Sequence, residues 1–420
     1  MANKSENKVY AQVAGLDIGN GCVKGIIKSN AGGETEIDIQ SVAAKNYRTN
    51  IGEIRTPLSE VESKISDIFN YLDATYESPC IDETGRYFIG KHAMETGSHP
   101  LIFDVGNEQR KSEQSLSFIL TLGCVAGKSL QDAWNATHVL PEVIHTTVKV
   151  VALALPIQEY RRYREIFASA YKQGAHKVII HTFEKDVEVN ITFDAVQVLA
   201  EGASATFAIR AGGSDLAAKL IANANQATDQ HIELTGEAIS TAKAIMGVDI
   251  GEGTTNLPIY DSKGNFNADA STSITNGYGI VLKDACTILK DNGIHFNNRK
   301  DLQTFLMNKD NMQFAPKKYK AVQSVVDSCI ENFAEQIADV YKEIMELHNT
   351  QVLVVYVYGG GATAMKYWLF QALVKKTRKL NGGLDPQPIL YFDNPEARML
   401  NRDGLYIAAK RILELMGETI

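Results

Sequence analysis

The chain has 420 residues, a net charge of −8 at pH 7, 45% hydrophobic residues and 22% charged residues. Its length exceeds what one compact core usually holds, so we expect at least two domains. The acidic balance disfavours direct coating of nucleic acid, which needs a basic surface, and no apolar run approaches the roughly 20 residues that span a membrane.

The cysteines and the N-terminal segment indicate in which cellular compartment the protein is expected. The five cysteines show no CxxC spacing, so neither a disulfide framework nor a zinc site is indicated. The Met1–Lys8 segment is polar and lacks the apolar core of a secretory signal. Together these features favour a reducing cytoplasm.

The first half of the chain predicts strands that alternate with helices. The first strand, Val9–Leu16, runs directly into a glycine-containing turn that begins at Asp17. Apolar spacing predicts helices over three later segments: Glu60–Leu72, Gln114–Ala126 and Ile157–Lys172. Further strands are expected at Arg86–Gly90, Val148–Leu155, Lys177–Thr182 and Val187–Leu199.

The second half repeats the pattern of the N-terminus. A strand at Ala244–Asp249 runs into a second glycine-containing turn, and a strand at Asn256–Tyr260 follows it. A long amphipathic helix is expected over Tyr319–His348, before a strand at Gln351–Tyr358 that ends in three glycines. A closing helix is expected at Arg402–Glu414.

Both turns have the composition of a phosphate-binding loop. They read Asp17-Ile18-Gly19-Asn20-Gly21 and Asp249-Ile250-Gly251-Glu252-Gly253-Thr254-Thr255. Glycines let backbone N–H groups approach an anion closely, and Asn20, Thr254, Thr255 and Lys24 add polar or positive groups. A carboxylate repels phosphate, so we expect Asp17 and Asp249 to hold Mg²⁺ through water. A single Asp-x-Gly after a strand is usually only a turn. Two copies, with Gly359, Gly360, Gly361 and Ala362 after a later strand, favour nucleotide binding.

Other nucleotide-binding patterns fit less well. No GxxxxGK[ST] segment joins a strand to a helix. The turn after Leu16 also lacks the G-x-G-x-x-G order of dinucleotide-binding folds.

The two turns and the triple glycine resemble the phosphate loops and adenosine motif of the actin, sugar-kinase and heat-shock-chaperone superfamily. Within it, the chain is most similar to the ParM-like bacterial actins that segregate plasmids. Gly85–Ala93, Leu153–Ile157 and the segment from Pro395 to Tyr406 carry further likeness in the right order.

This resemblance implies an α/β, actin-like fold of two duplicated RNase H-like domains with a nucleotide cleft between them. Domain I would hold residues 1–203, with a small subdomain at about 36–105, completed by the C-terminal helix at about 396–420. Domain II would hold residues 204–395, with a small subdomain at about 262–325.

The resemblance also implies a catalytic residue, Glu201, which would orient or activate the attacking water. A carboxylate at the end of a strand can do this, although it can also simply favour the start of the next helix. The 48-residue interval from Glu201 to Asp249 is long for the family. It either contains an added helix around Ala217–Gln226 or argues against Glu201.

The implied function is a polymerising ATPase that uses Mg²⁺ and ATP, or GTP, to form filaments for plasmid segregation. Its partners would be its own copies and a DNA-binding adaptor at a centromere-like site, without direct nucleic-acid or membrane binding. The main alternative is a sugar or small-metabolite kinase. A chaperone-type ATPase would carry a β-rich substrate domain that the sequence lacks, and a cell-shape actin would often begin with an amphipathic anchor.

Overall fold

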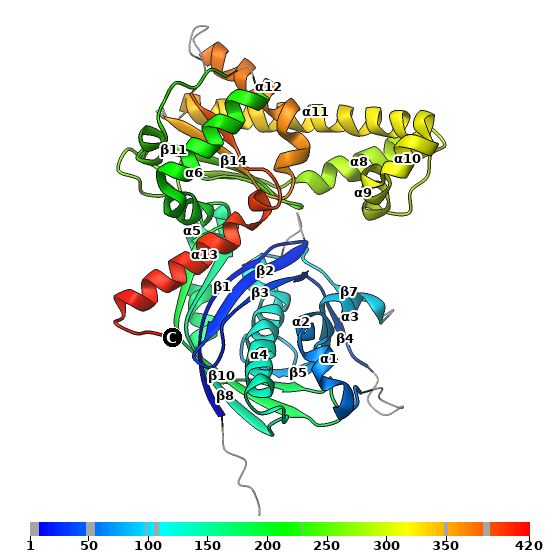
Figure 1. The fold of residues 1–420 in the computed structure, drawn as a ribbon, viewed down its shortest axis with the longest axis vertical. Helices are drawn as coiled ribbons and strands as arrows, with labels where there is room; N and C mark the ends of the chain where they lie inside the picture. Colours follow the sequence, from blue (N-terminus) through cyan, green and yellow to red (C-terminus); the bar gives the residue numbers. More distant parts are fainter. Residues whose placement is uncertain are drawn as a thin grey trace, which may run out of the picture. The chain divides into compact units, whose positions relative to one another are not determined.

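The computed structural model describes residues 8–47, 55–96, 99–104, 109–228, 230–347, 352–380 and 387–420. The chain forms two compact units, which Figure 1 shows in sequence colours. Unit 1 holds residues 1–208 and 401–420, and unit 2 holds residues 209–400. The chain passes from one unit to the other inside two helices, α6 (Ala205–Ala227) and α13 (Glu396–Leu415).

Unit 1 contains a sheet of ten strands in the order β3-β2-β1-β8-β10-β9-β5-β6-β4-β7. Its strands are β1 (Lys8–Ile18), β2 (Cys22–Ser29), β3 (Glu34–Gln40), β4 (Ala43–Lys45), β5 (Asp73–Glu77), β6 (Gly85–Ile89), β7 (Pro100–Leu101), β8 (Val143–Leu155), β9 (His176–Ile180) and β10 (Val187–Ala200). The central strands β1, β8 and β10 are parallel to one another. The second half of β8, residues 150–155, is apolar and buried on both faces, whereas β10 alternates buried residues with exposed ones such as Thr192 and Asp194.

The helices of unit 1 follow from its apolar pattern. They are α1 (Val61–Ile65), α2 (Ile68–Tyr71), α3 (Gly90–Glu95), α4 (Ser115–Thr137) and α5 (Ile157–Lys172), with short 3₁₀ turns η1 (Leu58–Glu60) and η2 (Lys111–Glu113). On β1, Ala14 and Leu16 belong to the large core that includes α4, whereas Val13 packs with Leu405 and Tyr406 of α13. Alternate residues of one strand thus bury against helices on opposite faces.

Unit 2 has a smaller sheet in the order β13-β12-β11-β14-β15. Its strands are β11 (Ile245–Ile250), β12 (Thr255–Leu257), β13 (Thr272–Ile274), β14 (Val354–Tyr358) and β15 (Ile389–Tyr391). Its helices, besides α6, are α7 (Gly236–Ser240), α8 (Tyr278–Asp291), α9 (Arg299–Met307), α10 (Lys309–Phe314), α11 (Pro316–Leu347) and α12 (Ala362–Leu380). Side chains of α8, α11 and α12 form one core with β11 and β14.

The two sheets share one arrangement. In unit 1, β1 is antiparallel to β2 and parallel to β8, which is parallel to β10. In unit 2, β11 is antiparallel to β12 and parallel to β14, which is parallel to β15. The order β3-β2-β1-β8-β10 therefore corresponds to β13-β12-β11-β14-β15. This repetition confirms the predicted α/β, actin-like fold built from a duplicated unit.

Some predicted boundaries were wrong. The segment Glu60–Leu72 is not one helix: a break at Ser66 and Asp67 separates α1 from α2. The helix predicted at Gln114–Ala126 continues to Thr137, because Lys128 and Asp132 form a buried ion pair inside it. The predicted ends His348 and Gln351, like most of the Met1–Lys8 segment, lie outside the described residues.

The helix α4 also contains a thiol that should be inert. Cys124 is fully buried, and burial raises the pKa of its thiol to about 12. We expect iodoacetamide at pH 8 to leave Cys124 unmodified in the native protein, because alkylation needs the thiolate. Peptide mass spectrometry would measure this, with the denatured protein as the control; fast native labelling of Cys124 would contradict the described packing.

None of the described helices has the length and apolar character needed to cross a membrane.

Candidate nucleotide-binding site

The first predicted turn joins β1 to β2 as a tight hairpin. The N–H of Gly19 donates a hydrogen bond to the carbonyl of Cys22 at 3.0 Å, and Asp17 lies opposite Lys24 in the strand ladder. A Cβ on Gly19 would come within 2.9 Å of that carbonyl, so the turn itself requires glycine there. Ser41 adds a second tie, because its hydroxyl donates to the carbonyl of Gly19 at 2.5 Å.

The second predicted turn has the same geometry in unit 2. The N–H of Gly251 donates to the carbonyl of Thr254 at 2.9 Å, and a Cβ on Gly251 would also come within 2.9 Å of that oxygen. Asp249 lies opposite Asn256 in the ladder between β11 and β12. Each aspartate thus lies opposite the residue seven positions later, and the duplication extends to the backbone of the turns.

The triple glycine packs directly against the second turn. Gly359 has φ of 94°, a conformation that favours glycine, and a Cβ on it would lie 2.5 Å from the Oδ1 atom of Asp249. The N–H of Gly361 donates to the carbonyl of Ile250 at 2.9 Å. The structure therefore brings together two motifs that are about 110 residues apart in sequence. Gly360, which lies between Gly359 and Gly361, is exposed, and a Cβ added to it would meet nothing within 4 Å.

The start of α8 completes this cluster in unit 2. The N–H groups of Tyr278 and Gly279 donate to the carbonyls of Gly251 and Glu252, each at 2.9 Å. The carboxylate of Glu252 also pairs with Arg299, at the start of α9, at 3.2 Å. The second turn is thus held from both sides, by the triple glycine and by the first turn of α8. Helix α12 begins at Ala362, directly after the glycines, and the start of a helix favours anions.

The two predicted metal-binding aspartates are both buried. Asp17 is 7% exposed and Asp249 is 5% exposed, and each is the last residue but one of the strand that leads into its turn. Lys24 is paired with Asp17 at 3.2 Å, so its ammonium group contacts a carboxylate as well as lying beside the turn. Beside the second turn, the hydroxyl of Thr255 is buried and makes no hydrogen bond within the described part of the chain.

These features fit a hydrated Mg²⁺ and a phosphate group. Mg²⁺ in nucleotide sites usually keeps several waters and uses one or two carboxylates, and each turn carries one such carboxylate, Asp17 in unit 1 and Asp249 in unit 2. A buried hydroxyl without a partner is rare in folded proteins, and phosphate oxygens are suitable acceptors for it. Among the described residues there is no group of three or more potential ligands that would hold a metal tightly without a nucleotide.

Glu201 lies directly after β10, where the sequence predicted a residue at a strand end. Its N–H donates to the carbonyl of Leu155 at 2.7 Å, and its carboxylate pairs with Lys111 at 2.5 Å. The side chains of Glu201 and Lys111 are 11% and 6% exposed. The interval before Asp249 is filled by the rest of α6, which is interrupted at Gly213, and by the short helix α7. Glu201 directly follows β10, and its catalytic role stays a prediction.

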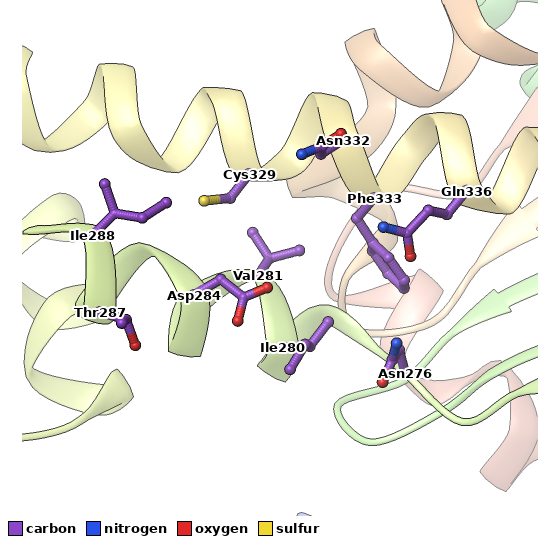
Figure 2. A pocket seen from close by; sticks show the side chains of 10 residues that line it. All are labelled: Asn276, Ile280, Val281, Asp284, Thr287, Ile288, Cys329, Asn332, Phe333 and Gln336. Atoms are coloured by element: carbon purple, nitrogen blue, oxygen red, sulfur yellow. The ribbon is translucent and has the colours of Figure 1, made fainter.

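A separate cavity of about 360 Å³ lies between α8 and α11 (Figure 2). Its polar lining is mainly Asp284 and three amide side chains, those of Asn276, Asn332 and Gln336. None of the predicted site residues lines this cavity. The cavity lies along helix α8, and the first two N–H groups of that helix bond to carbonyls of the second turn.

Sequence reasoning missed several residues that contact the turns or Glu201. Ser41 and Arg299 contact the turns and Lys111 pairs with Glu201, but no short motif marks these three residues. Gly277 had a detectable signal, because the segment Gly277-Tyr278-Gly279 before an amphipathic helix is typical of a tight helix start. A Cβ on Gly277 would lie 2.5 Å from the carbonyl of Gly251.

Two protein-family models match the chain. The model for the N-terminal domain of actin-like proteins matches residues 15–203, and the model for the C-terminal region of the archaeal actin homologue MreB-like proteins matches residues 247–370. No match was found among curated proteins.

Solved structures of actin-like proteins resemble the whole chain. Bacillus thuringiensis ParM with ATP is 16% identical, with a TM-score of 0.57 over 97% of this chain and 99% of that one. Actin-like protein Alp7A is also 16% identical, with a TM-score of 0.62 over 97% and 98%. A non-polymerisable quadruple mutant of pCBH ParM is 14% identical, with a TM-score of 0.55 over 96% and 100%.

The family models and the structural likeness agree with the repeated sheets and turns described above. The predicted resemblance to ParM-like bacterial actins is confirmed at the level of the fold. We conclude that the chain has an actin-like fold, with a region that matches an actin-like N-terminal domain and a region that matches an MreB-like C-terminal domain.

Proposed function

We propose that this protein binds and hydrolyses ATP, or GTP, with Mg²⁺, and that the nucleotide controls its assembly into filaments. The observation that carries the proposal is the repeated hairpin: two Asp-x-Gly turns in the same register, one of them packed against a glycine turn that leaves Gly360 open. Backbone amides in such turns suit phosphate, and an open glycine lets a nucleoside lie against the backbone.

In this proposal, each group of candidate site residues has its own role. The turns at Gly19–Gly21 and Gly251–Thr255 would offer amides and hydroxyls to phosphate oxygens, and Gly359–Ala362 would contact the nucleoside. Asp17 and Asp249 would hold the waters of Mg²⁺, which neutralises phosphate charge when it is bound. Glu201, fixed at the end of β10, would orient the attacking water.

The proposal that this protein forms filaments is supported by the structurally similar proteins rather than by the residues of the candidate site. A pCBH ParM mutant of similar fold is described as non-polymerisable, which indicates that its parent polymerises. We extend this to the present chain, and to plasmid segregation in the cytoplasm with a DNA-binding adaptor at a centromere-like site. The net charge of −8 agrees with DNA being bound through such an adaptor.

Light scattering would test the proposal. We expect scattering to rise after ATP and Mg²⁺ are added, to fall as phosphate is released, and to stay high with AMPPNP, which cannot be hydrolysed. GTP in parallel would give the base preference, and EDTA is the control for the metal. Electron micrographs of the same samples would show whether the scattering comes from filaments.

The alternative, a sugar or small-metabolite kinase, predicts a different result. Scattering would stay flat, and ADP release would rise when a suitable hydroxyl compound is added. That combination would overturn the filament proposal while leaving nucleotide binding in place. The domains proposed from the sequence, 1–203 with 396–420 and 204–395, could be compared by limited proteolysis with and without nucleotide.

A further inference from the structure

The buried pair of Lys111 and Glu201 carries an inference about how the proposed reaction is organised. The ammonium group of Lys111 lies 2.5 Å from the carboxylate of Glu201, and the two side chains are 6% and 11% exposed. A buried ion pair adds little net stability compared with an apolar pair of similar size, because both charges lose their hydration. Stability alone is therefore a weak explanation for this pair.

Both partners are fixed by one junction of the chain, where β8 ends and α5 begins. The carbonyl of Leu155, the last residue of β8, accepts from the N–H of Glu201 at 2.7 Å. In the first turn of α5, the two carboxylate oxygens of Glu159 accept from the N–H groups of Lys111 and Ser112 at 3.0 and 2.9 Å. The short segment that carries Lys111 is therefore clamped to the same element that holds Glu201.

Further contacts keep Lys111 in place. Its carbonyl accepts from the hydroxyl of Ser117 at 2.9 Å, and its ammonium group lies 5.5 Å from the centre of the Phe103 ring. The neighbouring Arg110 stacks on Tyr163 of α5, with its guanidinium 4.1 Å from the ring centre. Lys111 thus approaches Glu201 from a rigid segment, and the carboxylate has a fixed charged partner.

We propose that Lys111 is a positioning residue for Glu201: it holds the carboxylate in the orientation needed to align water. This inference rests on the proposed function. A carboxylate held by a fixed cation cannot rotate freely, and small errors in placement of a catalytic group cost up to about 100-fold in rate.

The test is steady-state hydrolysis of ATP by the full chain, together with nucleotide affinity and thermal unfolding. We expect Lys111→Met to lower kcat about 10- to 100-fold with little change in nucleotide Kd, and Lys111→Arg to restore part of the rate. In a Glu201→Gln background, Lys111→Met should lower the rate no further, because the two residues act as one unit. The double variant removes the charges of both Lys111 and Glu201, so it leaves no unpaired buried charge that would cause misfolding.

Lys128→Met is the matched control. Lys128 forms an equally buried pair with Asp132 in the same unit, at 2.6 Å, with side chains 3% and 2% exposed. It should lower the unfolding temperature and leave kcat near that of the wild type. Equal losses of kcat from Lys111→Met in both backgrounds, or an equal loss from Lys128→Met, would overturn the inference. An unchanged kcat in Glu201→Gln alone would instead remove Glu201 from the proposed function.

Discussion

Replacing Glu201 with glutamine is expected to slow phosphate release from ATP by about 100-fold or more, with nucleotide affinity nearly unchanged. The amide keeps an acceptor for Lys111, whereas alanine would leave that buried ammonium group unpaired and destabilise the protein. Glutamine cannot take a proton from water, so the effect should appear in kcat. Single-turnover phosphate release with a fluorescent phosphate sensor would measure it.

Asp194→Asn is the control for this substitution. Asp194 lies on the same strand, β10, and pairs with Lys149 at the surface, so the variant makes the same change of charge away from the strand end. We expect its turnover to match that of the wild type. Filaments of Glu201→Gln should also persist longer after assembly, because hydrolysis would no longer disassemble them. Normal turnover in Glu201→Gln would show that another group aligns the water.

A second large effect is expected from Gly359→Ala. The new Cβ would lie 2.5 Å from the Oδ1 atom of Asp249 and 2.5 Å from the carbonyl oxygen of Ile250, and φ of 94° is unfavourable for alanine. We expect the free energy of unfolding to fall by about 1–3 kcal/mol. Because the clash falls on the second turn, nucleotide affinity should fall at least about tenfold, which corresponds to 1.4 kcal/mol.

Gly360→Ala is the matched control for stability. A Cβ there meets nothing within 4 Å, so the unfolding transition should stay where it is in the wild type. Thermal unfolding by circular dichroism and titration with a fluorescent ATP analogue would compare the two variants. Equal stability of both would contradict the described packing of the glycine turn on Asp249.

Much of the fold could be predicted from local patterns. The helix α5 (Ile157–Lys172) was predicted to the residue, because its apolar spacing is regular and Pro156 and Gly174 bound it. The strands β8 and β10 were recognisable as apolar runs, although β8 begins five residues before the predicted start. Such elements are determined by a periodicity that lies within a few residues.

What could not be predicted depends on contacts between distant segments. Lys128 and Asp132 are charged, so an apolar pattern ends the helix before them, but pairing lets them lie inside α4. Gly123 and Gly127 lie in the same helix, where a Cβ on either would meet neighbouring side chains, such as Tyr76 and Phe69, at 3.0 Å or less. Close packing, which a sequence pattern does not show, explains these residues.

The candidate site likewise has residues that the sequence predicted and residues that it did not. Its turns were visible because glycine and aspartate recur at fixed spacing, whereas only the structure shows that Gly359 and Gly361 pack against the second turn. The pairing of Lys111 with Glu201 could not be predicted, because the two residues lie 90 positions apart and no motif links them. Supporting residues of this kind become apparent only when the folded chain places them together.

The matched registers of the two hairpins expose a difference between duplicated halves. Cross-strand partners share one face of a sheet, and Asp17 faces a lysine where Asp249 faces the neutral amide of Asn256. One copy therefore carries its own counter-charge, and the other does not have one at that position. The two hairpins thus share a backbone register but differ in charge, so exchanging Lys24 and Asn256 would move the positive charge from one Asp-x-Gly turn to the other.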